Sequence, residues 1–113
     1  MNSLFLLVLI PLLDLPWLFV TNTFASSMIR KIQGEDMKVK IWAAALVYVA
    51  LAYLATLPKT ATQAFLLGLS VYAVYDFTNL STFERYDLRF AIADSIWGGI
   101  LFWIVFKIIH HLQ

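Results

Sequence analysis

The sequence predicts an all-α membrane protein, a single transmembrane domain over residues 1–113. Its four transmembrane helices form an up-down bundle, with a short interfacial helix after the first span. Hydrophobic residues make up 62% of the chain and charged residues 13%, whereas a soluble domain has about 25% charged residues. The mean hydropathy is +0.82. Apolar stretches recur at residues 2–24, 41–57, 61–80 and 88–110. Too few polar groups remain to cover a soluble surface, so lipid must be the solvent for much of it.

The first span covers residues 2–24. At a rise of about 1.5 Å per residue it extends roughly 34 Å, enough to cross a hydrocarbon core of about 30 Å. Pro11 and Pro16 each remove a backbone hydrogen bond, which predicts a kink. Asp14 and Trp17 lie three residues apart and therefore share one helix face.

Residues 25–40 are the most polar stretch of the chain. Apolar residues there alternate at helical spacing with basic and polar ones: Met28, Ile29 and Ile32 against Arg30, Lys31 and Gln33. This pattern predicts the interfacial helix, ending at Gly34 because glycine favours the turn after a helix. The alternative is a solvated loop.

The second and third spans are separated by a very short connection. Residues 41–57 carry no charge and are rich in alanine, and Pro58 ends them. The short loop predicts that the two spans are antiparallel neighbours. In the span at 61–80, Ala64 and Gly68 form a small-xxx-small pair, which favours close helix packing. Ser81-Thr82-Phe83-Glu84 resembles a capping box and predicts a new helical turn there.

The fourth span, residues 88–110, carries a longer stripe of small residues. Ala91, Ser95 and Gly99 recur every four residues, and Gly98 lies on an adjoining face with Asp94 and Trp97. The stripe predicts a close helix–helix contact.

Basic residues are unevenly distributed between the connections. Six lie in the 1–2 and 3–4 connections, and two lie on the opposite side: Arg30, Lys31, Lys38, Lys40, Arg85 and Arg89 against Lys59 and Lys107. The positive-inside rule then places the charged connections in the cytoplasm and both termini outside, in an inner or plasma membrane if the protein is bacterial.

Three carboxylates fall within predicted spans: Asp14, Asp76 and Asp94. Asn79 lies one turn from Asp76, on the same helix face. Basic residues are missing from the middle of every span, so ionised carboxylates there would lack a countercharge. Protonation, a bound cation, or hydrogen bonds from Trp17, Trp97, Tyr75, Asn79 or a freed backbone group would resolve this. Three interpretations stay open: an interhelical structural clamp, a site for an ion, proton or solute, and a catalytic site.

A short motif occurs twice. Asp14-Leu15-Pro16-Trp17 and Asp94-Ser95-Ile96-Trp97 share the form Asp-x-x-Trp. An indole N–H one turn from a carboxylate can reach a carboxylate on a neighbouring helix, although so short a repeat also arises by coincidence.

Other recognisable chemistry is missing from the sequence. It has no cysteine, no glycine-rich phosphate loop, no Ser-His-Asp pattern and no basic stripe for nucleic acid. His110 and His111 are adjacent and point in different directions on a helix, so we expect interfacial residues and not a metal site. Trp42, Phe83 and Tyr86 fit an interfacial aromatic belt. We expect no cofactor and no enzymatic activity.

Three segments together resemble the signature of an uncharacterised membrane protein family, domain-of-unknown-function family 2177. They are Leu13-Asp14-Leu15-Pro16-Trp17-Leu18, the stretch from Tyr75 to Thr82, and Asp94-Ser95-Ile96-Trp97-Gly98. The resemblance implies four spans and one shared polar site, and it carries no activity. Its signature positions would be Asp14, Trp17, Tyr75, Asp76, Thr78, Asn79, Asp94, Trp97 and Gly98.

Two functions follow as hypotheses. The first is a non-enzymatic structural or accessory component of a membrane assembly, in contact with lipid and with other membrane chains or copies of itself. The second is a small transporter or channel that acts as a homo-oligomer and binds a proton or cation at Asp14, Asp76, Asn79 and Asp94.

Overall fold

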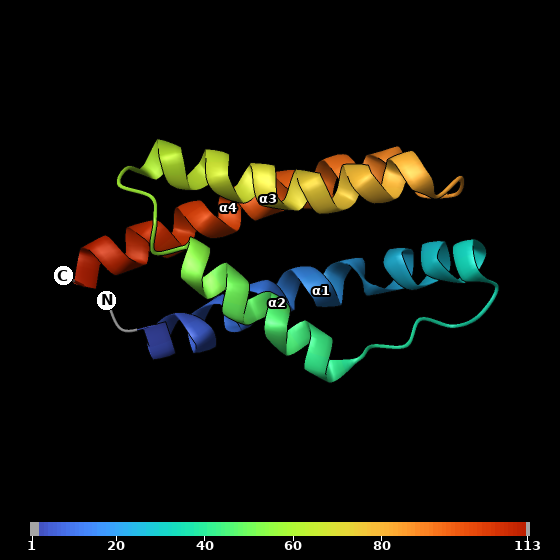
Figure 1. Ribbon diagram of the computed structural model, residues 1–113, viewed down its shortest axis with the longest axis horizontal. Helices are drawn as coiled ribbons and strands as arrows, with labels where there is room; N and C mark the ends of the chain where they lie inside the picture. Colours follow the sequence, from blue (N-terminus) through green and yellow to red (C-terminus); the bar gives the residue numbers. More distant parts are fainter. Residues whose placement is uncertain (1–2, 113) are drawn as a thin grey trace.

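The computed structural model describes residues 3–112, which form four α-helices. They are α1 (Ser3–Gln33), α2 (Ile41–Leu54), α3 (Ala61–Thr82) and α4 (Leu88–Leu112). Figure 1 shows that the helices run alternately back and forth. The α1–α2 and α3–α4 connections therefore lie at one end, and the α2–α3 connection lies at the other. The longest dimension is 47 Å, close to the thickness of a bilayer with its headgroups, about 40–45 Å.

The helices associate as two pairs. α3 packs closely along α4, while α1 contacts both α2 and α4. The prediction that the second and third spans are neighbours is wrong, because α2 packs on α1 instead. A short connection brings two helix ends together without fixing where the helices go next. The small residues of α3 match those of α4, and this match decides the pairing.

The predicted interfacial helix is not a separate element. α1 continues without a break through both prolines to Gln33. Its final turns pack on the start of α4, where Met28 lies in a buried cluster with Tyr86 and Ala91. This apolar contact explains why the helix does not turn away at the interface. The predicted end at Gly34 is confirmed, since Gly34 has φ +78° and its N–H donates to the Arg30 carbonyl at 2.8 Å.

The predicted helical turn at Ser81 is also wrong. The hydroxyls of Ser81 and Thr82 donate back to the Thr78 carbonyl at 2.8 and 2.9 Å, so these residues complete α3. α4 begins after Asp87, whose Oδ1 accepts the backbone N–H of Arg89 at 2.8 Å in the manner of an N-cap.

Two of the helices in residues 3–112 are long and apolar enough to cross a membrane: Leu4–Gln33 and Leu88–Leu112. α2 is apolar but has only 14 residues, about 21 Å of helix at 1.5 Å per residue. It is shorter than the predicted 41–57 because the N–H groups of Thr56 and Leu57 donate to carbonyls three residues back, in a turn that ends the α-helix. α3 has the length but carries Gln63, Asp76 and Asn79. The four predicted spans thus correspond to four helices, two of which are clear membrane spans.

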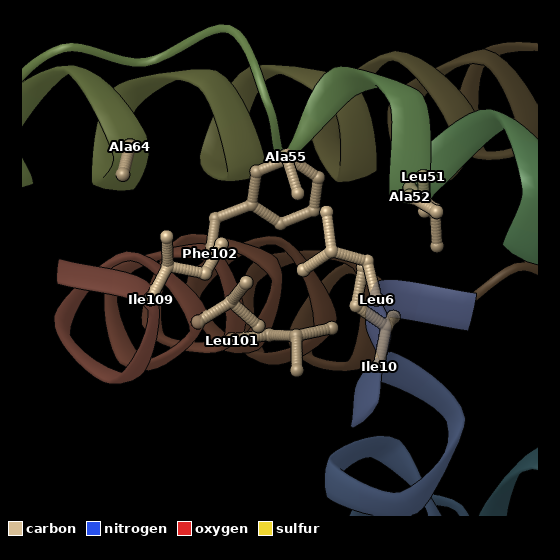
Figure 2. Close-up of a cluster of buried hydrophobic side chains, with 10 residues drawn as sticks. Leu6, Ile10, Leu51, Ala52, Ala55, Ala64, Leu101, Phe102 and Ile109 are labelled. Carbon is tan, nitrogen blue, oxygen red and sulfur yellow. The ribbon is translucent and has the colours of Figure 1, made fainter. Parts of the chain in front are cut away.

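One apolar cluster joins all four helices near the end where the α2–α3 connection lies. Figure 2 shows its side chains, which point inward from each helix: Leu6 and Ile10 from α1, Leu51 and Ala52 from α2 with Ala55 just after its end, Ala64 from α3, and Leu101, Phe102 and Ile109 from α4. The outward-facing surface of the bundle is also apolar. Every helix exposes large apolar side chains, among them Phe19, Leu46, Val74 and Ile96. This is the surface expected of a protein whose solvent is lipid.

Candidate polar site inside the bundle

Glycines bring α3 and α4 together. A Cβ on Gly68 would overlap the carbonyl of Gly98, and a Cβ on Gly98 would lie 2.7 Å from the Gly68 carbonyl oxygen and overlap the Tyr72 ring. No other residue type allows this approach. Because the two helices are antiparallel, one turn forward from Tyr72 on α3 corresponds to one turn back from Gly98 on α4. Those two positions are Asp76 and Asp94.

Asp76 is completely buried. Its Oδ1 accepts the hydroxyl of Tyr86 at 2.7 Å. Its Oδ2 is also buried and has no hydrogen-bond partner. The carboxyl of Asp94 is its neighbour across the α3–α4 interface. Two buried acids therefore lie side by side, and Asp76 Oδ2 is left without a hydrogen-bond partner.

The two Asp-x-x-Trp motifs bind each other. Trp17 on α1 donates its indole N–H to Asp94 Oδ1 at 2.8 Å, and Trp97 on α4 donates to Asp14 Oδ1 at 2.7 Å. The two indole rings stack, with centroids 5.5 Å apart and planes at 12°. Since α1 and α4 run in opposite directions, identical spacing on each helix places each Trp opposite the other's Asp. The arrangement is a reciprocal clamp with local two-fold character.

Tyrosines complete the cluster from other elements. Tyr48 on α2 donates to Asp14 Oδ2 at 2.6 Å, so both oxygens of Asp14 are hydrogen-bonded. Tyr72 on α3 lies within electrostatic reach of all three carboxyls. Burial and the Asp76 carboxylate both raise the pKa of Tyr86, so its hydroxyl stays protonated and remains a donor.

The predicted site residues fall into two groups. Asp14, Trp17, Asp76, Asp94 and Trp97 come together in the interior. The other three lie toward the outside. The Tyr75 side chain is 60% exposed and Thr78 is exposed, while Asn79 is half-buried beside the hydroxyls of Tyr75 and Tyr86.

The predicted packing residues lie on α3 and α4, and Gly68, Gly98 and Gly99 meet the opposite helix of this pair. All six are buried: Ala64, Gly68, Ala91, Ser95, Gly98 and Gly99. Gly99 faces the Phe65 ring. The Ser95 hydroxyl donates to the Ala91 carbonyl at 2.7 Å, within its own helix. Ser95 therefore acts as a small packing residue, with its polar group satisfied locally.

Sequence reasoning missed the three tyrosines, Tyr48, Tyr72 and Tyr86. The assignment of Tyr86 to an interfacial belt is wrong, since it is 6% exposed and binds Asp76. Trp42 and Phe83 are exposed. One signal was available for Tyr48, which is a phenol in a chargeless, alanine-rich helix. A buried hydroxyl requires a partner, and the acids of the other helices were the available acceptors.

The ion pairs in the described part of the chain include none of the three buried carboxyls. The two pairs are Arg30 with Asp36 at 3.7 Å and Arg89 with Asp87 at 3.1 Å. Within residues 3–112, no group of three or more His, Cys, Asp or Glu side chains is arranged to hold a metal ion. The cluster is acidic, and neutral Trp and Tyr side chains donate to each of its three carboxyls, although Asp76 Oδ2 has no partner. Such a site can hold helices in register, and it can take up a cation or a proton.

Comparison with known protein families gives a match over most of the chain. A family model described as "Predicted membrane protein (DUF2177)" matches residues 1–107. No curated protein and no solved structure matches the chain.

Proposed function

The chain belongs to the DUF2177 family of predicted membrane proteins, and from that premise we propose that it is a four-span, non-enzymatic integral membrane protein. The observation that carries the proposal is the distribution of polarity. All four helices expose large apolar side chains, while three carboxyls and their Trp and Tyr donors lie inside. A lipid-facing exterior around a hydrogen-bonded polar interior suits α3 as a third span despite its Asp76. α2 suits a short span that locally thins the bilayer.

The charged connections would face the cytoplasm, as the positive-inside rule favours. Because the chain has no cysteine, single cysteines can report the topology. A membrane-impermeant maleimide should label Lys59→Cys in intact cells. Lys38→Cys and Glu84→Cys should react only after the membrane is opened. If Lys59→Cys and Glu84→Cys reacted from the same side, α3 would not cross the bilayer and the four-span proposal would be wrong.

The role we favour is that of a structural or accessory component of a membrane assembly. The reciprocal clamp supports this role, because Asp14 and Asp94 each accept a hydrogen bond from an indole on another helix. The broad apolar faces suit contact with lipid and with other membrane chains. Gentle extraction from the native membrane followed by native mass spectrometry tests this role. Co-extraction with different, larger chains is expected, and release as a lone chain or homo-oligomer would contradict it.

One observation favours a second candidate, a small transporter or channel for a proton or cation. Asp76 Oδ2 is buried without a partner, which a purely structural clamp does not require. A four-helix chain has little room for a path, so this function needs a homo-oligomer. In proteoliposomes, Asp76→Asn should abolish flux while the protein stays folded. Equal flux in both proteins would eliminate this candidate.

A further inference from the structure

The carboxyl pair of Asp76 and Asp94 has a hydrogen-bonding deficit that its surroundings do not cover. When both groups are ionised, neither can donate a hydrogen bond to the other. Asp76 Oδ2 is then a buried acceptor with no partner, next to a second negative charge. Burial of one unpaired charge is already costly, and like charges in contact increase that cost.

The groups around the pair cannot supply a countercharge. Tyr86 from the α3–α4 connection donates to Asp76, and Trp17 from α1 donates to Asp94. Tyr72 and Tyr75, on α3 itself, are the other titratable groups in electrostatic reach of both acids. Asp14 from α1 adds a further acid near Tyr72. All of these are neutral donors or acids, so none of the described side chains around the pair supplies a positive charge.

We propose that Asp76 and Asp94 form a binding site for one proton, shared between the two carboxyls across the α3–α4 interface. The proton gives Asp76 Oδ2 the partner it lacks and reduces the pair to a single negative charge. The site goes beyond the accessory role and deepens the transport candidate, because it selects a proton over a metal cation as the ligand. This inference rests on the proposed membrane placement in one respect: lipid around the bundle would keep bulk water away from the two carboxyls.

A metal ion fits this pocket less well than a proton. Calcium takes about six to eight oxygen ligands and magnesium about six in an octahedron. Here one oxygen of each acid already accepts an N–H or O–H, from Trp17 or Tyr86. Asp76 is 0% exposed, so its carboxyl has no contact with the surface from which waters would complete a coordination shell.

The two outer donors connect the shared proton to the rest of the bundle. Tyr86 belongs to the α3–α4 connection and Trp17 belongs to α1. Loss of the proton would place a second negative charge on the pair and strengthen both of these hydrogen bonds. Binding or loss of the proton therefore changes the strength of the Trp17 bond in the clamp and of the Tyr86 bond at the α3–α4 connection.

Infrared spectroscopy of the whole protein in lipid nanodiscs at neutral pH tests the proposal. The wild type should show the C=O stretch of a protonated carboxyl. Asp76→Asn and Asp94→Asn should each remove that band. Asp14→Asn is the matched comparison and should keep it, because both oxygens of Asp14 are already hydrogen-bonded. Circular dichroism establishes that each variant is folded. Absence of the band in the wild type would overturn the proposal, as would its survival in both Asp76→Asn and Asp94→Asn.

Two further measurements keep the result unambiguous. If an Asn variant does not fold, Tyr86→Phe should shift the frequency of the band, because it removes only the O–H that donates to Asp76; an unshifted band would contradict the shared site. Titration with Na⁺, K⁺ or Mg²⁺ should leave the band unchanged, and its saturable loss would identify a cation site instead. The cysteine-labelling experiment judges the membrane topology independently, so failure of either proposal is distinguishable from failure of the other.

Discussion

At the scale of single residues, each indole of the clamp both stacks on its partner and donates to an acid. Trp17→Phe keeps an aromatic ring but removes the donor to Asp94. We expect a loss of about 1–2 kcal/mol in the free energy of unfolding, since interhelical hydrogen bonds in membranes contribute about 0.6 kcal/mol on average and up to about 1.7, and the acid left behind stays buried. Reversible unfolding in mixed micelles measures it.

Trp103→Phe is the control for this substitution. Trp103 is 43% exposed on α4 and lies near Lys107, outside the clamp. Its loss should change the unfolding free energy little, whereas Trp97→Phe should resemble Trp17→Phe because the clamp is reciprocal. Equal effects of Trp17→Phe and Trp103→Phe would show that the indole N–H contributes nothing beyond its ring.

The glycines of the α3–α4 interface make a second residue-scale prediction. Gly68→Ala and Gly98→Ala should each destabilise the protein by about 1–3 kcal/mol, because the added methyl meets helix backbone that cannot move aside. Gly99→Ala is the matched control, since the nearest atoms to its methyl would be those of the Phe65 ring, 2.8 Å away, and a ring can rotate. Thermal unfolding in one detergent ranks the three. A larger loss for Gly99→Ala than for Gly68→Ala would contradict this account of the interface.

At the scale of elements, the start of α4 has its own pH dependence. Arg89 holds the pKa of Asp87 below its usual range. A carboxyl whose pKa is lowered by folding stabilises the fold above its unfolded pKa, and this contribution disappears as the pH falls through the folded pKa. The amide resonance of Arg89, which donates to Asp87, should therefore titrate below about pH 3.9, the usual aspartate value. Asp87→Asn should abolish the titration, and a midpoint above that value would contradict the capping role.

The sequence predicts the helices better than it predicts their neighbours. The order of the elements and the end at Gly34 follow from apolar runs and turn chemistry. The partner of α2 does not, because its alanines occur on every side of the helix and specify no single face. The α3–α4 contact could be anticipated from Gly68, Gly98 and Gly99, since only small residues permit it. The length of α1 could not, because its last turns depend on Tyr86 and Ala91, which lie far along the chain.

The polar site also has a part that the sequence predicts and a part that it does not. The repeated Asp-x-x-Trp spacing is enough to predict the reciprocal clamp once α1 and α4 are known to be antiparallel neighbours. The bonds from Tyr48 to Asp14 and from Tyr86 to Asp76 depend on where other elements arrive, so local patterns could not reveal them. Tyr75 and Thr78 share the stretch around Asp76 but point outward, because a helix turns successive residues to different sides.

At the scale of the whole molecule, the bundle is unevenly secured. α3 and α4 are joined along their length by close backbone contact, whereas α2 buries little beyond Leu51 and Ala52 and crosses α1 obliquely. Among residues 3–112, one side-chain hydrogen bond joins α2 to the polar cluster, from the Tyr48 hydroxyl to Asp14. We therefore expect α2 to open before the α3–α4 pair does, since regions with few buried contacts have the lowest local stability.

Hydrogen exchange in nanodiscs measures this order of opening. On mild warming, amides of α2 should lose protection first, while those around Gly98 and Phe102 on α4 persist. Leu51→Ala should accelerate exchange in α2 and leave α4 unchanged, because Leu51 lies where α2 meets the common core. The matched substitution Leu46→Ala, at an exposed position of α2, should have little effect. If α2 and α4 lost protection together in the wild type, the bundle would be one cooperative unit. A change at the shared proton or the clamp would then alter the stability of α2 as well.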